Sequence, residues 1–576
     1  MRKTFIAPAL LCALVTSLLA FNLQAQSGSR PNILFMMVDD MGYTDIGVYG
    51  SEINTPNLDQ LANDGLLLTN FYNEAVCSTT RAAVLGGTDN HIAGGGFSQH
   101  QTPNQQGQPG YEPYLNEAVA PFSATLQTAG YNTYYAGKWH LGTQPHQRPN
   151  ARGFDRSFAL LSGMSSHYND MSFVALDRKS PYAVDGVDID SLPEDFYSTT
   201  FYTDYIIESI EKDSETGDPW FAYLSYTAPH WPLQAPDEYI AKYEGMYDHG
   251  YEVQREIRTE KGIELGIFPE ETESYRRLAI VDPWDSLTAE EQAISAKKME
   301  IHAAMLDLLD ENVGRLIGYL KETDQYDNTL IMFISDNGAE GQARNPAGAN
   351  DGGFDNSYEN MGRQFSFHHI GAEWAAVGGG PLRYFKSMSS EGGIRGPAII
   401  HYPQSDSKGV ISDAFTTVVD IAATFIDLAG ADHPEFGFNG HPIEPLGGES
   451  MVPLIMGDSD QVHPDDYVFG WEVFGHLAVR KGDWKLLQLA NPATDRGQRP
   501  AEEAGFWGLY DISADPGETN DLSAEHPEKV EELLAAWETY SAEHQIIIPI
   551  IEEQAGGAAM GAGMGAGMGA GMGAGG

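Results

Sequence analysis

Two pairs of acidic or amide residues follow buried apolar runs. Asp39 and Asp40 come after the run 32–38, and Asp336 and Asn337 come after the run 329–335. Because the carboxyl ends of parallel strands meet at one edge of a sheet, we expect these four side chains to converge. Four oxygen ligands suit a hard divalent cation, Ca2+ or Mg2+, whereas zinc would require histidine or cysteine. Any one such residue is more often a turn former or helix N-cap, so the prediction depends on both pairs together.

A lone cysteine is the second candidate group. The chain has two cysteines, Cys12 and Cys77, and Cys12 lies in a predicted signal peptide, so the mature chain is predicted to contain no intramolecular disulfide. The residues after Cys77, Ser-Thr-Thr-Arg-Ala-Ala-Val-Leu, predict a helix that begins at or near it, with Arg81 one turn further on the same face. An anion or activated oxygen at position 77 would meet helix N–H groups and a guanidinium. The alternative is an inert, buried thiol.

The elements that must position these residues alternate between strands and helices. A further buried run, 220–226, is predicted to be a strand, and helical patterns lie at 56–64, 121–129, 200–212, 288–322 and 418–429. This alternation predicts an α/β fold with a large mixed, mostly parallel sheet between helices. The long irregular segment 340–395 is predicted to help form the site.

The C-terminal part of the sequence predicts a smaller unit. Short aromatic-rich strands at 467–475, 476–480, 484–489 and 507–510 precede a helix at 527–541. We therefore predict four regions: a signal peptide at 1–25, a catalytic α/β domain at 26–460, a small α+β subdomain with an antiparallel sheet and a packed helix at 461–548, and a disordered Met/Gly/Ala-rich tail at 549–576.

The N-terminus and the charge balance restrict the compartment and the partners. Arg2 and Lys3 precede an apolar run and a small-residue site, which predicts cleavage near Ala25 and export to the periplasm or medium of a bacterium, with an uncleaved anchor as the alternative. The 33 basic and 82 acidic residues give a net charge of −49, which argues against nucleic acid, and against a membrane in the mature form, as partners. An anionic substrate would then need a local cluster of basic side chains and a cation.

Eight stretches of the sequence resemble a known enzyme family. They span about residues 31 to 545 and read PNILFMMVDDMGYTDIG, TPNLDQLANDG, CSTTRAAVLGGTDNHIAG, AGKWHLG, APHWPLQAP, DNTLIMFISDNGAEG, RYFKSMSSEGGIRGPAIIHYP and GDWKLL. Together they resemble the type I, formylglycine-dependent sulfatases of the alkaline-phosphatase-like superfamily, most closely the bacterial arylsulfatases. The resemblance implies hydrolysis of sulfate esters, in which an aryl sulfate and water give a phenol and sulfate.

The resemblance also implies a modified residue and a metal. In that family the cysteine becomes a Cα-formylglycine, so modified Cys77 would attack sulfur with one hydroxyl of its hydrate, and the other hydroxyl would collapse to the aldehyde and expel sulfate. A formylglycine-generating maturase is the implied partner. One Ca2+ per chain would be bound by Asp39, Asp40, Asp336 and Asn337, together with an oxygen of modified residue 77. Asp336 is also a candidate acceptor of the nucleophile's proton.

The resemblance assigns the remaining catalytic and binding roles to basic residues. By resemblance, Arg81 would hold the hydrated aldehyde, and Lys138 and Lys386 would bind the sulfate group. His140 would act as the base for elimination, and His230 would protonate or polarise the leaving oxygen. These groups form the positive cluster that an acidic chain requires for an anionic substrate.

One position departs from the family pattern. Thr79 stands where the family has proline or alanine two residues after the cysteine. The converting enzyme reads that position, so the departure predicts inefficient conversion of Cys77 in some hosts or dependence on a different maturase.

Other functions share parts of this set. A phosphodiester or phosphonate monoester hydrolase would use the same nucleophile. A binuclear phosphatase acting through Ser78 or Thr79 is disfavoured because the sequence lacks an obvious second set of Asp and His ligands. A silent binder of sulfated glycans would need neither a nucleophile nor a leaving-group acid. The sequence leaves the natural ester open between small phenolic or alkyl sulfates and sulfated polysaccharide fragments.

Overall fold

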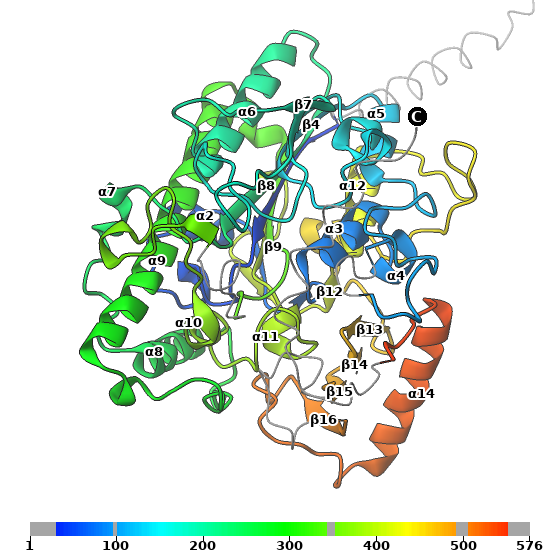
Figure 1. Cartoon of the computed structure of the whole chain (residues 1–576). Coiled ribbons are helices and arrows are strands. Elements are labelled where there is room, and N and C mark those ends of the chain that lie inside the picture. Colours follow the sequence, from blue (N-terminus) through cyan, green and yellow to red (C-terminus); the bar gives the residue numbers. More distant parts are fainter. Residues whose placement is uncertain (1–29, 96–100, 342–351, 491–504, 551–576) are drawn as a thin grey trace, which may run out of the picture.

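A ten-stranded sheet forms the main body of the computed structural model, which describes residues 30–95, 101–341, 352–490 and 505–550 (Figure 1). The strand order is β11-β2-β10-β9-β1-β8-β4-β5-β6-β7. The five central strands are parallel: β9 (Thr329–Ser335), β1 (Asn32–Asp39), β8 (Trp220–Pro229), β4 (Asn132–Lys138) and β5 (Arg156–Leu160). The flanking strands are β11 (Val410–Ser412), β2 (Leu66–Leu68), β10 (Ala398–His401), β6 (Tyr182–Val184) and β7 (Val187–Ile189). Because β10 runs antiparallel to β9 and β2, the sheet is mixed, as predicted.

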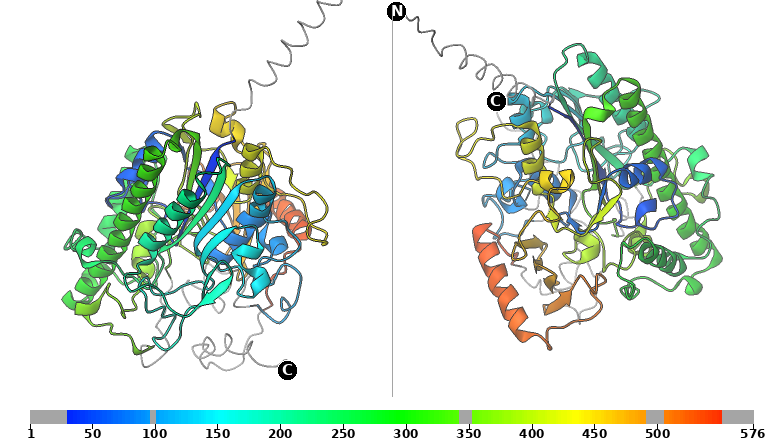
Figure 2. Two further views of the ribbon diagram at one scale, coloured as in Figure 1. Left: turned by 90° about the horizontal axis from the view of Figure 1, so that it is seen from above. Right: turned by 180° about the vertical axis from the view of Figure 1, so that it is seen from behind.

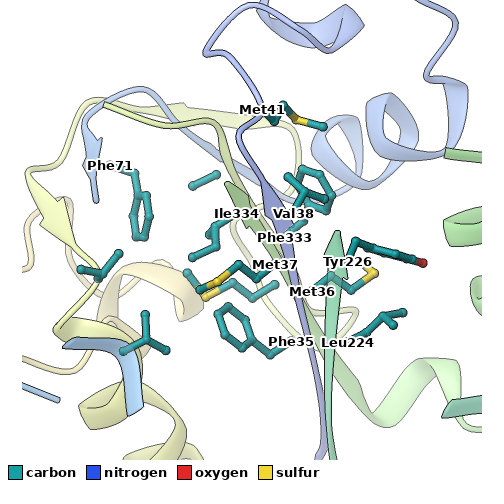
Figure 3. Packing of buried hydrophobic residues seen from close by; sticks show 14 of the residues in the cluster. Phe35, Met36, Met37, Val38, Met41, Phe71, Leu224, Tyr226, Phe333 and Ile334 are labelled. Carbon is teal, nitrogen blue, oxygen red and sulfur yellow. The ribbon is translucent and has the colours of Figure 1, made fainter. Parts of the chain in front are cut away.

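Strand β1 is fully buried at the centre of this sheet. Its apolar run sends alternate side chains, such as Phe35 and Met36, to opposite faces of the sheet (Figure 3). In parallel register, Phe35 pairs with Tyr223 of β8 and with Met332 of β9. These three strands therefore end at the same edge of the sheet.

Helices cover both faces of the sheet (Figure 2). One face carries α2 (Pro56–Asn63), α6 (Ser198–Asp213) and α9 (Ala289–Glu322), and the other carries α3 (Cys77–Gly86), α5 (Phe122–Thr128) and α12 (Asp420–Ala429). Further α-helices before the C-terminal sheet are α4 (Asn90–Ala93), α7 (Asp237–Ile240), α8 (Tyr251–Glu264), α10 (Gly371–Gly378), α11 (Glu391–Ile394) and α13 (Val452–Met456). Within the described ranges, we find no helix with both the length and the apolar character needed to cross a bilayer.

A second, antiparallel sheet follows near the C-terminus. It consists of β13 (Val468–Val473), β14 (His476–Lys481), β15 (Trp484–Gln488) and β16 (Trp507–Asp511), and α14 (Pro527–Glu543) packs on it through Leu533, Trp537 and Tyr540. A two-stranded ladder joins β3 (Phe71–Tyr72) to β12 (Thr416–Thr417). The predicted small sheet with a packed helix is thus confirmed. The predicted signal peptide, and the predicted tail from residue 551 onward, lie outside the described residues.

Candidate active site

Neighbouring parallel strands bring the predicted acidic residues to one edge of the sheet. β1 ends at Asp39, and β9 ends just before Asp336 and Asn337. Asp40 has a φ of 69°, a left-handed conformation that aspartate adopts more readily than most residues. Its N–H donates to Asp336 Oδ1 at 3.1 Å, which ties the two strand ends together. The predicted convergence of the two pairs is therefore present.

Cys77 is the first residue of α3 and lies beside this acidic edge. Its Sγ is 4.0 Å from Asp40 Oδ1. Burial raises the pKa of the Cys77 thiol to about 12, although the nearby ammonium groups of Lys138 and Lys386 act to lower it. A thiol with such a pKa stays protonated at neutral pH, so the unmodified side chain is a weak nucleophile.

Arg81 is buried one turn along α3 and links several parts of the site. Its Nη2 lies 2.8 Å from Asp336 Oδ2, and its Nη1 donates to the Lys138 carbonyl oxygen at 2.7 Å. Both oxygens of Asp336 are thus engaged, one by Arg81 and one by the Asp40 N–H. The guanidinium, with Lys138 and Lys386, keeps the pKa of Asp336 below its usual value even though burial would raise it.

Two buried lysines neutralise the two consecutive aspartates. Lys138, the last residue of β4, places its Nζ 2.8 and 2.7 Å from the two carboxylate oxygens of Asp39. Lys386 lies between α10 and α11, within the segment predicted to form the site, and its Nζ is 2.6 Å from Asp40 Oδ1. Each ammonium group therefore lies where a metal cation bound to the same carboxylate would also lie.

Two histidines flank the acidic groups. His230 follows β8, with Nε2 3.4 Å from Asp40 Oδ2 and Nδ1 2.7 Å from the Trp231 carbonyl oxygen. His140 follows β4 by two residues and is partly exposed, with a φ of 55°. Burial of its ring lowers the pKa of His140 well below the usual value, and the charges of Lys138 and Arg81 lower it further. A neutral imidazole of this kind can accept a proton.

The arrangement fits a hard divalent cation. Asp39, Asp40, Cys77 and His230 each offer one ligand atom, and these four atoms lie within 4.8 Å of one another. Asp40 Oδ2 and Asn337 Oδ1 are buried and accept no hydrogen bond from the described residues. Burial raises the pKa of Asp39 to about 8 and also raises that of Asp40, although Lys138 and Lys386 act to lower them. A cation bound to their oxygens would offset the cost of burying these carboxylates.

Two contributors to the site were not predicted from the sequence. Glu340 is buried, and its Oε2 lies 3.3 Å from Lys386 Nζ and 3.5 Å from Trp231 Nε1. Trp231 packs its ring against that of His230, with centroids 4.5 Å apart. The available signal was position, because both residues lie inside stretches that carry the family resemblance.

Comparisons with known proteins identify the family of the chain. A family model described as Sulfatase matches residues 31–431, and one described as N-sulphoglucosamine sulphohydrolase, C-terminal, matches residues 380–538. An uncharacterized sulfatase of Schizosaccharomyces pombe is 41% identical over 557 residues, covering 92% of this chain and 96% of the relative. An arylsulfatase of Klebsiella aerogenes is 37% identical over 460 residues, covering 77% of this chain and 96% of the relative.

A solved structure shares the fold over most of the chain. The crystal structure of Ps i-CgsB in complex with k-i-k-neocarrahexaose superposes with a TM-score of 0.62 at 25% identity. The match covers 90% of this chain and 94% of that one.

Proposed function

The chain belongs to the sulfatase family and is a sulfuric ester hydrolase, and from this premise we propose that it cleaves aryl sulfates with a nucleophile made from Cys77 beside a bound Ca2+. The observation that carries the proposal is the position of Cys77, at the start of α3 and 4.0 Å from Asp40. The identity to an arylsulfatase supports a phenol as the leaving group.

Calcium is proposed because the ligand set consists mainly of oxygens. By the family resemblance, Asp39, Asp40, Asp336 and Asn337 would hold it, with an oxygen at residue 77. The structure groups ligand atoms of Asp39 and Asp40 with those of Cys77 and His230, and Asn337 Oδ1 is buried without a hydrogen bond from the described residues. When bound, the ion would supply positive charge to the sulfate oxygens and to the nucleophile. Lys138 and Lys386 would then exchange part of their contact with Asp39 and Asp40 for contact with the sulfate group.

The proposed nucleophile is a Cα-formylglycine hydrate at position 77. It would supply a hydroxyl for attack and a second hydroxyl through which sulfate is released. Arg81, fixed by Asp336 and the Lys138 carbonyl oxygen, would orient the hydrate. His140, kept neutral, would accept the proton of the second hydroxyl during release. His230 would donate a proton from Nε2 to the leaving oxygen while its Nδ1 stays bound to the Trp231 carbonyl oxygen.

The proposal includes a maturation step and export. Conversion of Cys77 requires a maturase that accepts Thr79, and the N-terminal pattern supports export with cleavage near Ala25. Mass spectrometry of the purified protein tests both points, through the mass of the peptide that contains residue 77 and through the first residue of the mature chain.

A chromogenic aryl sulfate tests the activity. We expect turnover that is lost after chelation, restored by added Ca2+ and abolished in the Cys77→Ala variant. An aryl phosphodiester measured beside it tests the alternative substrate class, and a preference for the phosphodiester would contradict the proposal. Full sulfatase activity with an unmodified thiol at residue 77 would contradict the mechanism.

A sulfated polysaccharide fragment is the second candidate substrate. One observation favours it: the structural relative at 25% identity was solved in complex with k-i-k-neocarrahexaose. A desulfation screen that compares aryl sulfates with marine sulfated glycans distinguishes the two substrate classes.

A further inference from the structure

Glu340 is a buried carboxylate that the roles above leave unexplained. It lies three residues after Asn337 and is 4% exposed. Lys386 Nζ is 3.3 Å from Glu340 Oε2 and 2.6 Å from Asp40 Oδ1. One ammonium is therefore shared by two carboxylates, of which Asp40 belongs to the proposed cation site and Glu340 does not.

The same oxygen of Glu340 also lies near Trp231. Trp231 Nε1 is 3.5 Å from Glu340 Oε2, and the Trp231 ring packs on that of His230. Glu340 therefore joins the loop that carries Lys386 to the loop that carries His230. A buried carboxylate is costly unless it is paired and hydrogen bonded, and these contacts offset that cost.

Asp40 by itself would be a poor anchor for a lysine that must bind substrate. An ammonium and a divalent cation compete for the same carboxylate, because each is attracted by its charge. The flexible stem of Lys386 lets its ammonium follow the stronger partner.

We propose that Glu340 is a positioning residue that shares the Lys386 ammonium with Asp40, and thereby keeps Asp40 available to the cation and Lys386 available to sulfate. The inference rests on the proposed function of the site. We assign its effect to the 3.3 Å ion pair with Lys386, the direct contact that Glu340 makes to a proposed sulfate-binding group.

The Glu340→Gln variant tests this role because it keeps the size of the side chain and removes its charge. Lys386 would then pair with Asp40 alone. We expect the affinity of the metal-free protein for Ca2+, measured by calorimetry, to fall roughly ten- to hundredfold, as is usual when a partner outside the ligand shell is lost. We expect the affinity for inorganic sulfate, measured as competitive inhibition, to fall in the same range.

An effect of charge alone would change the sulfate affinity in the opposite direction. If Glu340 merely repelled anions, its neutralisation would tighten sulfate binding. Tighter or unchanged binding of sulfate, or unchanged binding of Ca2+, would therefore overturn the proposal. Glu340→Asp, which keeps the charge on a shorter stem, should weaken both affinities less, and it replaces Glu340→Gln if that chain does not fold.

Two further variants separate positioning from general damage. Glu472→Gln removes a carboxylate of similar burial, 5% exposed, that pairs with His91 away from the site. It should lower the melting temperature without changing either affinity. In a Lys386→Met background, Glu340→Gln should have no further effect on sulfate binding, and an equal loss in both backgrounds would show that Glu340 does not act through Lys386.

Failure of this inference can be told apart from failure of the proposed function. Calcium binding is measured without turnover, whereas the proposed function fails if the wild-type protein, with residue 77 converted, does not hydrolyse sulfate esters.

Discussion

At the scale of single residues, the site balances its carboxylates with lysines and leaves some oxygens unsatisfied. Lys138 pairs with Asp39, and Lys386 pairs with Asp40. Asp40 Oδ2 and Asn337 Oδ1 nevertheless receive no hydrogen bond from the described part of the chain. Asp40 Oδ2 lies 3.4 Å from His230 Nε2, but a buried oxygen that accepts no hydrogen bond is costly, so we expect ligand binding to depend strongly on these two side chains.

Asp40→Asn should therefore weaken cation binding more than any change outside the ligand set. The substitution keeps the shape of the side chain and removes one negative charge. We expect the Ca2+ affinity of the metal-free protein to fall about a hundredfold or more in calorimetric titration. Asp420→Asn is the control. Asp420, the first residue of α12, is also buried, but its carboxylate pairs with His463 and accepts a hydrogen bond from the Thr417 N–H, away from the proposed cation site. An equal loss of affinity in both variants would contradict the assignment.

His230→Asn should lower activity by an amount that depends on the leaving group. If His230 donates the proton, phenols of high pKa need it most, so we expect kcat/KM to fall roughly 10²- to 10⁴-fold for them and much less for nitrophenols. A series of aryl sulfates measures this slope. A loss that is constant across the series would assign His230 to binding instead.

Glu340 is a site residue whose burial could not be predicted from the sequence. The acidic pairs were predicted because they follow apolar runs, and the basic residues were assigned by family resemblance. Glu340 follows Gly338 and Ala339, a context that indicates an ordinary polar turn. Its burial depends on Lys386 and Trp231, which are distant in sequence, and no local pattern indicates such contacts.

At the scale of elements, the C-terminal sheet supports the segments that form the site. Lys485 of β15 is fully buried, with Nζ 2.8 Å from Glu391 Oε1 and 2.9 Å from Glu518 Oε1. Glu391 begins α11, five residues after Lys386, and also accepts a 2.7 Å hydrogen bond from Tyr72 Oη. Tyr72 ends β3, five residues before Cys77. One lysine of the small sheet thus stabilises two segments that carry site residues.

Lys485→Met should destabilise the protein substantially. It leaves two buried carboxylates without their shared cation, so we expect the free energy of unfolding to fall by about 3–5 kcal/mol, measured from denaturant midpoints. Lys481→Met is the matched control, because Lys481 lies on neighbouring β14, is 30% exposed and pairs with Glu532. There we expect about 1 kcal/mol or less. Similar losses in the two variants would argue against the support described here.

The elements themselves were largely predictable. The runs 32–38 and 329–335 became β1 and β9 almost residue for residue, because continuous apolar segments of that length suit a strand buried on both faces. The patterns at 288–322 and 527–541 became α9 and α14. The strand order could not be predicted from the sequence. β10 lies antiparallel between β9 and β2, and this pairing depends on contacts between segments that are distant in the sequence.

At the scale of the whole molecule, one histidine ties the main body to the C-terminal unit. His91 of α4 lies with Nδ1 2.8 Å from Asp89 Oδ1 and Nε2 3.2 Å from Glu472 Oε2 of β13. Asp89 Oδ2 also accepts a 2.6 Å hydrogen bond from Tyr540 of α14. Burial acts to lower the pKa of His91, but the two carboxylates raise it to about 10.

This histidine should make stability depend on alkaline pH. Its pKa is about 6.5 in an unfolded chain and about 10 in the folded one, so its contribution is complete below pH 6.5 and is lost as the pH rises to about 10. Urea midpoints measured at about pH 6 and about pH 10 should differ less in His91→Gln than in the wild type. The variant should also be less stable at the lower pH. An unchanged difference between the two midpoints would show that other groups set the alkaline limit.

If residue 77 is converted as proposed, its burial limits when during biosynthesis the conversion can take place. Its side chain is 3% exposed in the folded protein, so an enzyme that converts it must reach it before this part of the polypeptide has folded. Lys485, which helps to close the neighbouring segments, is translated 408 residues later. At about 5–20 residues per second, a ribosome leaves roughly 20–80 s between the two. If residue 77 is converted as proposed, slowing or speeding translation across that stretch should therefore change the fraction of molecules that are converted.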